Sequence, residues 1–184
     1  MIPLLLQIGL GFSPQLSGLL LAPTALGVLL AKPCSLWLLR ALGYKKLLTI
    51  NTLLAGLSIW LFISIGAQTP IYAIGLMTMI YGFLLSMQFT AMNSLAYADI
   101  PSESLSAATS IMATLQQIAL SLGVAVSAIF IRLFSSSLND NFALTPTIFH
   151  YTFFSIGGFT LLSTLIFLRL KQDDGQQMLH PKAE

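Results

Sequence analysis

Long apolar segments with very few charges constrain this chain more than any other feature of its sequence. The segments reach the length of about 20 residues that a helix needs to cross the hydrocarbon core of a bilayer. Charged residues make up 8% of the 184 residues and hydrophobic residues 56%, whereas soluble domains carry about 25% charged residues. The segments are apolar on every face, so they lack the alternation of outer-membrane barrel strands. The sequence therefore predicts an all-α membrane protein.

We predict five membrane-spanning helices, separated by Gly, Pro and charged residues. The predicted spans are 15–39, 47–66, 71–98, 103–134 and 147–170. Residues 1–8 form another apolar fragment, too short to cross a bilayer and followed by Gly9, Gly11 and Pro14. We expect residues 1–170 to form one helical unit and residues 171–184 to form a disordered polar tail.

The basic residues are concentrated in two places that four predicted crossings separate. Arg40, Lys45 and Lys46 lie between the first two spans, and Arg169 and Lys171 follow the fifth span. Basic residues accumulate on the cytoplasmic side of membrane proteins. The pattern predicts a multi-pass protein of the plasma (bacterial inner) membrane with its C-terminus in the cytoplasm.

Polar side chains inside the predicted spans are the candidates for a binding cavity, because each is unfavourable in hydrocarbon. These candidates are Lys32, Gln88, Asn93, Gln116 and Gln117. For Lys32 the alternative is a side chain that extends to the cytoplasmic interface, and for the amides it is hydrogen bonding between helices. Neighbouring residues on a helix point about 100° apart, so Gln116 and Gln117 cannot face the same cavity.

Small residues mark two further features of the spans. In the fourth span Ala119, Gly123 and Ser127 recur at a spacing of four, which predicts close packing against another helix. Gly56, Gly75 and Gly82 are expected to make the second and third spans more flexible.

Several short motifs follow one another in an order that resembles a known family. They are Pro3 to Pro14 with Gln7, Met92-Asn93-Ser94-Leu95, Asp99-Ile100-Pro101, and Ala107-Ala108 followed by Gln116-Gln117 and Gly123. Together they resemble the C-terminal half of major facilitator superfamily transporters, in the drug:proton antiporter branch typified by EmrB and QacA. The resemblance covers residues 1 to about 170.

The resemblance implies a six-helix half whose first helix is truncated. It also implies proton-coupled efflux of drugs or small metabolites by alternating access between two halves. We expect no bound cofactor, with the proton gradient as the energy source. The expected partners are the lipid bilayer, a small-molecule substrate and a missing N-terminal half or a second copy, with no nucleic acid. We expect no enzyme activity, and the alternative function is a non-transporting membrane interaction or assembly subunit.

Residues 40–46 resemble the cytoplasmic loop motif of the same family. Gly43, Lys45 and Lys46 match the motif, whereas Arg40 and Ala41 replace its acidic residue and the residue after it. The charge-relay part of the motif is therefore lost. We expect the segment to act as a positively charged cytoplasmic anchor.

Overall fold

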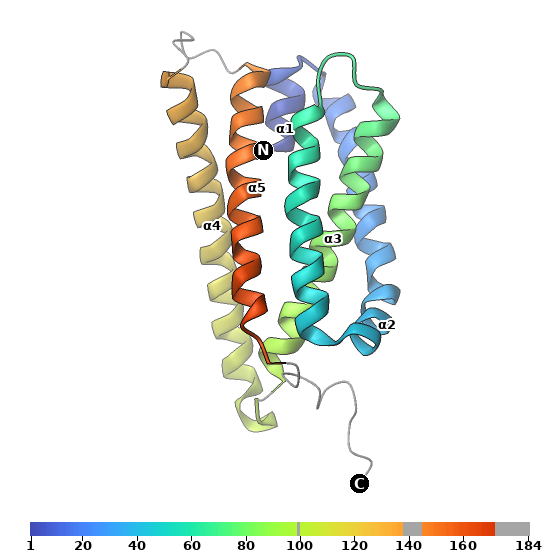
Figure 1. Ribbon diagram of the computed structural model, residues 1–184, viewed down its shortest axis with the longest axis vertical. Helices are drawn as coiled ribbons and strands as arrows, with labels where there is room; N and C mark the ends of the chain where they lie inside the picture. Colours follow the sequence, from blue (N-terminus) through green and yellow to red (C-terminus); the bar gives the residue numbers. More distant parts are fainter. Residues whose placement is uncertain (99, 138–144, 172–184) are drawn as a thin grey trace.

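The computed structural model describes residues 1–98, 100–137 and 145–171, and it is a bundle of long helices (Figure 1). All the regular secondary structure of these residues is helical, so the predicted all-α class is confirmed. The predicted disordered tail lies outside the described residues except for Lys171.

Five α-helices and three short helical turns make up the described chain. In order they are α1 (Ile2–Leu4), the π-helical turn η1 (Leu5–Gly9), α2 (Pro14–Leu61), the 3₁₀ turn η2 (Phe62–Ser64), α3 (Ile71–Tyr97), the 3₁₀ turn η3 (Ser102–Ser104), α4 (Leu105–Ser137) and α5 (Pro146–Leu168). Among the described residues, four continuous helical stretches are long and apolar enough to cross a membrane: Pro14–Ser64, Ile71–Tyr97, Leu105–Ser137 and Pro146–Leu168.

Gly43 divides the first of these stretches into two arms that run in opposite directions (Figure 1). Its backbone has φ 72° and ψ 166°, a conformation that is essentially restricted to glycine. The first arm, residues 14–42, overlaps the predicted span 15–39, and the second arm, residues 44–61, overlaps the predicted span 47–66. Because Gly43 divides the first stretch in two, the four stretches contain five helical segments that could cross a membrane.

Two clusters of buried apolar side chains fill the bundle. One joins the N-terminal segment to η2 and the start of α5, and contains Leu5, Leu6, Phe62, Phe149 and Phe153. The other joins the Gly43 reversal to α3, with Leu39, Tyr44, Leu48, Met87 and Ala91 at its centre and Phe167 and Leu170 packed against it. The reversal and the end of α5 therefore lie at the same end of the bundle, so the two basic segments do too.

The first arm of α2 crosses α3 at a point of very close contact. A Cβ at Gly27 would overlap the carbonyl oxygen of Met79, and a Cβ at Gly82 would overlap the carbonyl oxygen of Thr24. Two helix backbones can approach this closely only where neither helix carries a side chain. Close packing, rather than the expected flexibility, explains the glycine at position 82.

Two hydrogen bonds flank this crossing on α3. The hydroxyl of Thr78 donates to the carbonyl of Leu20 at 2.9 Å, and the hydroxyl of Ser86 donates to the carbonyl of Val28 at 3.4 Å. Both donors lie four residues from Gly82, so they share its face of the helix. The crossing fixes the position of α3, which carries part of the candidate site.

Candidate functional site

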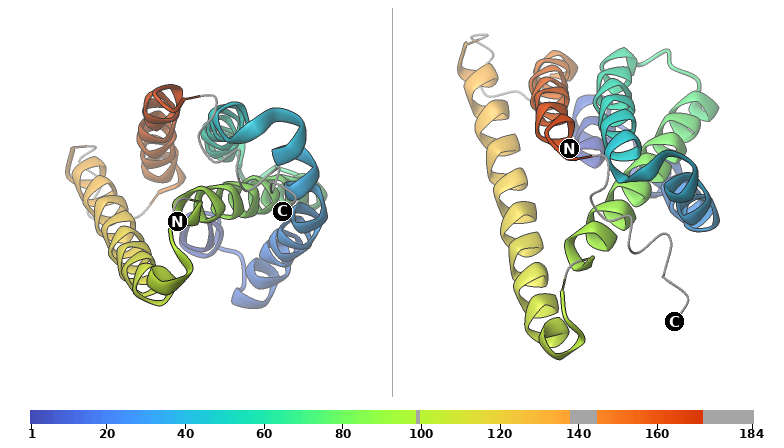
Figure 2. Two further views of the ribbon diagram at one scale, coloured as in Figure 1. Left: turned by 90° about the horizontal axis from the view of Figure 1, so that it is seen from below. Right: turned by 60° about the horizontal axis from the view of Figure 1, so that its bottom comes forward.

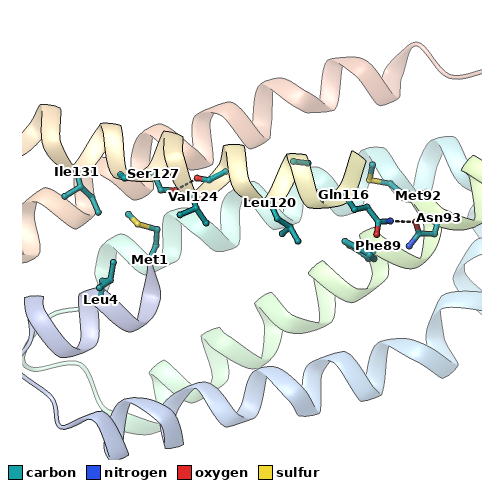
Figure 3. Close-up of a pocket in the computed structure, with 13 residues that line it drawn as sticks. Met1, Leu4, Phe89, Met92, Asn93, Gln116, Leu120, Val124, Ser127 and Ile131 are labelled. Carbon is teal, nitrogen blue, oxygen red and sulfur yellow. Dashed lines mark hydrogen bonds between the residues drawn. The ribbon is translucent and has the colours of Figure 1, made fainter. Parts of the chain in front are cut away.

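An apolar groove runs between α3, α4 and the N-terminal segment (Figure 3), and we call it the α3–α4 groove. Its volume is about 560 Å³, which is within the usual range for small-molecule sites. It is lined by Met1 and Leu4, by Phe89, Met92 and Asn93 of α3, and by Gln116, Ala119, Leu120, Gly123, Val124, Ser127, Ala128 and Ile131 of α4.

Helix α4 stands at the edge of the bundle (Figure 2). Most of its side chains are exposed. Leu120 is 59% exposed and Val124 is 71% exposed. No atom of the described residues outside the helix would contact a Cβ at Gly123 within 4 Å. Gly123, at the centre of the stripe Ala119, Gly123 and Ser127, therefore makes no close contact with another helix among the described residues, and packing of the stripe against a helix outside this chain stays a prediction. Within this chain these small residues form a wall of the groove.

A pair of side-chain amides connects the two walls of the groove. The Nε2 of Gln116 donates a hydrogen bond of 2.7 Å to the Oδ1 of Asn93 (Figure 3). Among the described residues, no other side-chain hydrogen bond joins α4 to another helix. Two of the candidates chosen from the sequence thus lie together in the groove, although they are 23 residues apart.

Gln88 lies on the same helix as Asn93 but faces the second arm of α2. Its Oε1 accepts a hydrogen bond of 2.8 Å from the Nδ2 of Asn51, and its Nε2 donates one of 3.0 Å to the hydroxyl of Thr52. The Nδ2 of Asn51 also donates to the carbonyl of Leu84 at 2.9 Å. Gln88 is therefore part of a polar contact between helices and does not line the groove.

The other two candidates also lie outside the groove. Lys32 is exposed on the first arm of α2, between the exposed apolar side chains of Leu29 and Leu36. Gln117 is exposed on α4 and does not belong to the groove lining. Of the two adjacent glutamines, Gln116 alone contributes to the groove.

The loop motif forms a well-anchored turn at the basic end of the bundle. Tyr44 follows Gly43 directly, is 2% exposed, and its hydroxyl lies 2.7 Å from the hydroxyl of Ser94 on α3. The carbonyl of Lys45 accepts a hydrogen bond from the hydroxyl of Thr49 at 2.7 Å, and Lys46 is exposed. The turn thus joins both arms of α2 to α3.

Several residues of the groove could not be recognised from the sequence. Phe89 and Met92 precede Asn93 on α3, and Leu120 and Val124 follow Gln116 on α4. In a helix that is apolar on every face, the sequence does not indicate which neighbouring helix an apolar residue contacts. The one available indication was that these residues lie close in sequence to Asn93 and Gln116. In the part of the chain that the structure describes, no three His, Cys, Asp or Glu side chains are grouped to hold a metal ion.

The chain belongs to the Major Facilitator Superfamily, whose family model matches residues 1–184. This match confirms the resemblance drawn from the sequence motifs, and the protein is a multi-pass membrane protein of that family. It is similar to proteins named "Putative multidrug resistance protein MdtD" from three bacteria. The identity is 31% over 179 residues for Escherichia coli, 32% over 183 residues for Pectobacterium carotovorum and 33% over 177 residues for Klebsiella pneumoniae.

These alignments cover 97%, 99% and 95% of this chain but only 38%, 39% and 37% of the relatives. The chain therefore spans less than two fifths of the length of the curated relatives it matches. No solved structure matches the chain.

Proposed function

We propose that the chain forms one half of a membrane exporter that moves drugs or small apolar metabolites out of the bacterial cell. Membership of the Major Facilitator Superfamily and the multidrug resistance names of the relatives support transport over enzymatic catalysis. They do not favour the alternative of a non-transporting membrane subunit.

The observation that carries this proposal is the α3–α4 groove. Its walls are largely apolar and adaptable, since they include Met1, Met92 and Phe89, and such side chains can repack around ligands of different shape. It also contains one polar pair, Asn93 and Gln116, that can orient a bound molecule. A site of this kind suits the export of varied lipophilic compounds.

The exposed side of α4 supports the presence of a further set of helices. Transport by alternating access requires two halves that move around a site between them, and here the groove has α4 on one side with little packed against it. We propose that the partner is an N-terminal half, or alternatively a second copy of this chain. Its helices would pack on α4 and close the groove.

The location of the basic residues supports an orientation in the membrane. The Gly43 reversal and the end of α5 share one end of the bundle, and basic residues gather on the cytoplasmic side. We propose that this end faces the cytoplasm and that the inward proton gradient drives export.

A dye-accumulation assay in an efflux-deficient Escherichia coli strain tests the proposal. The chain is expressed alone and together with the part of the Escherichia coli relative that precedes the matched region. We expect reduced accumulation of the uncharged lipophilic dye Nile red for the pair, restored by a protonophore, and no reduction for the chain alone.

Three results would each contradict a different part of the proposal. Efflux by the chain alone, at the rate of the pair, would contradict the requirement for another half. Efflux that persists with the protonophore would contradict proton coupling. Unchanged accumulation with a correctly inserted pair would contradict export.

A further inference from the structure

The polar side-chain atoms of the α3–α4 groove that remain free to bind a ligand are concentrated at one place. Of the 13 residues that line it, Asn93, Gln116 and Ser127 have polar side chains. The hydroxyl of Ser127 donates to the carbonyl of Gly123 on its own helix at 2.7 Å, so its proton is already used. Among the side chains of the lining, the capacity to donate hydrogen bonds to a ligand therefore resides in the amide pair of Asn93 and Gln116.

The pair is only partly satisfied by its own hydrogen bond. A side-chain amide has two N–H donors and a carbonyl oxygen with two lone pairs. The 2.7 Å bond uses one N–H of Gln116 and one lone pair of the Asn93 oxygen. Within the described residues, the Oε1 of Gln116 and the Nδ2 of Asn93 have no other side-chain partner. They offer an acceptor and a donor next to each other on the groove wall (Figure 3).

The remaining lining restricts the charge of the ligand. None of the lining residues has an ionisable side chain, and the α-amino group of Met1, the ionisable group of this lining, belongs to a residue toward the opposite end of the groove from the amide pair (Figure 3). A charged group bound at the pair would therefore lose its hydration without gaining a counter-charge beside it, which is strongly unfavourable. A neutral polar group loses far less, and hydrogen bonds to an amide can compensate it.

We propose that the Asn93–Gln116 pair selects uncharged, largely apolar ligands that carry a hydrogen-bond donor beside an acceptor, such as a primary amide or sulfonamide. The apolar body of the ligand lies against Phe89, Met92 and Leu120, and its polar group exchanges hydrogen bonds with the pair. This inference rests on the proposed function, since it assigns a substrate class to the same groove.

Three fluorescent probes that share one aromatic body separate the contributions of donor, acceptor and charge. Dansylamide has a donor beside an acceptor, N,N-dimethyl dansylamide keeps the acceptor alone, and dansyl sulfonate is an anion. Each is titrated against the full 184-residue chain in lipid nanodiscs, and the signal from empty nanodiscs is subtracted. We expect dansylamide to bind about tenfold more tightly than the dimethyl probe, because the dimethyl probe leaves the part-buried acceptor of the pair without a donor. The sulfonate should bind more weakly than both.

Two matched variants test whether the preference belongs to the pair. The double variant Asn93→Leu/Gln116→Met roughly keeps the size of both side chains but removes their polar atoms, and should bind both neutral probes equally. Gln117→Met changes the same residue type at the same depth of α4 but outside the groove, and should keep the tenfold preference.

The outcomes separate this inference from the proposed function. Equal binding of the two neutral probes to the wild-type chain, or equal loss of preference in both variants, overturns the inference and leaves the groove as a substrate site. If no probe binds the wild-type chain, both the inference and the assignment of the groove to substrate are overturned.

Discussion

Substitution of Gly27 by alanine tests the close crossing of the first arm of α2 and α3. The new Cβ would overlap the carbonyl oxygen of Met79 and lie 2.8 Å from the amide nitrogen of Phe83. Both atoms belong to the backbone of α3, so no side chain can rotate away. The overlap is relieved only if the two helices move apart by about 1 Å. A gap of this size also weakens the surrounding van der Waals contacts between the helices.

The expected loss of stability follows from what this separation breaks. The 2.9 Å hydrogen bond from Thr78 to the carbonyl of Leu20 would lengthen beyond hydrogen-bonding distance, at about 1 kcal/mol. A gap of this size also forfeits a quarter to a half of each dispersion contact, and over some tens of atom pairs this amounts to about 1–2 kcal/mol. The sum, about 2–3 kcal/mol, agrees with the usual effect of overpacking.

The assay is unfolding of the chain by increasing mole fractions of SDS in mixed micelles, followed by circular dichroism. Gly18→Ala is the matched control, because Gly18 lies on the same arm and a Cβ there meets nothing within 4 Å. Both variants gain the same helix propensity, about 0.5–1 kcal/mol. Their free energies of unfolding should therefore differ by about 2–3 kcal/mol, with Gly27→Ala the less stable. Equal unfolding midpoints for the two variants would refute the close-packing argument.

Three further substitutions probe other parts of the structure. Gly43→Ala should destabilise the chain by about 1–3 kcal/mol in the same SDS titration, because its backbone conformation is essentially restricted to glycine; an unchanged midpoint would contradict a fixed reversal. Gln88→Met should lower stability by about 1 kcal/mol through lost hydrogen bonds to Asn51 and Thr52, and dansylamide binding should stay unchanged, whereas lost binding would connect Gln88 to the groove. Lys32→Ala should leave dansylamide binding unchanged, because Lys32 lies outside the groove lining; weaker binding would show that its ammonium group reaches the cavity.

The local chemistry of the chain was sufficient to predict its class and its helices. A helix satisfies its own backbone hydrogen bonds, so a long apolar segment is stable in lipid whatever surrounds it. The range predicted for the third span, 71–98, differs from α3 by one residue at its end. The turn around Gly43 was predicted from the same kind of local signal, a glycine followed by two lysines. The positive φ of Gly43 and the contact between the hydroxyls of Tyr44 and Ser94 were not predicted from the sequence.

The direction in which each polar side chain points could not be predicted from the sequence. Gln88 and Asn93 were equal candidates, yet Gln88 contacts the second arm of α2 and Asn93 contacts Gln116 on α4. Helices that are apolar on every face have no preferred side, so their sequence does not indicate which neighbour a given residue meets. The stripe of small residues on α4 illustrates the same limit, because small side chains permit both close packing and an open groove.

The sequence by itself thus determined that the chain crosses a membrane as helices, where those helices break, and which end carries the basic residues. These properties depend on burial in lipid and on local backbone geometry. Only the tertiary structure decided that Gly27 and Gly82 let two backbones meet, and that Asn93 and Gln116 form one pair across a groove. Such contacts depend on how the helices are rotated and spaced against one another, which is set by the packing of all of them together.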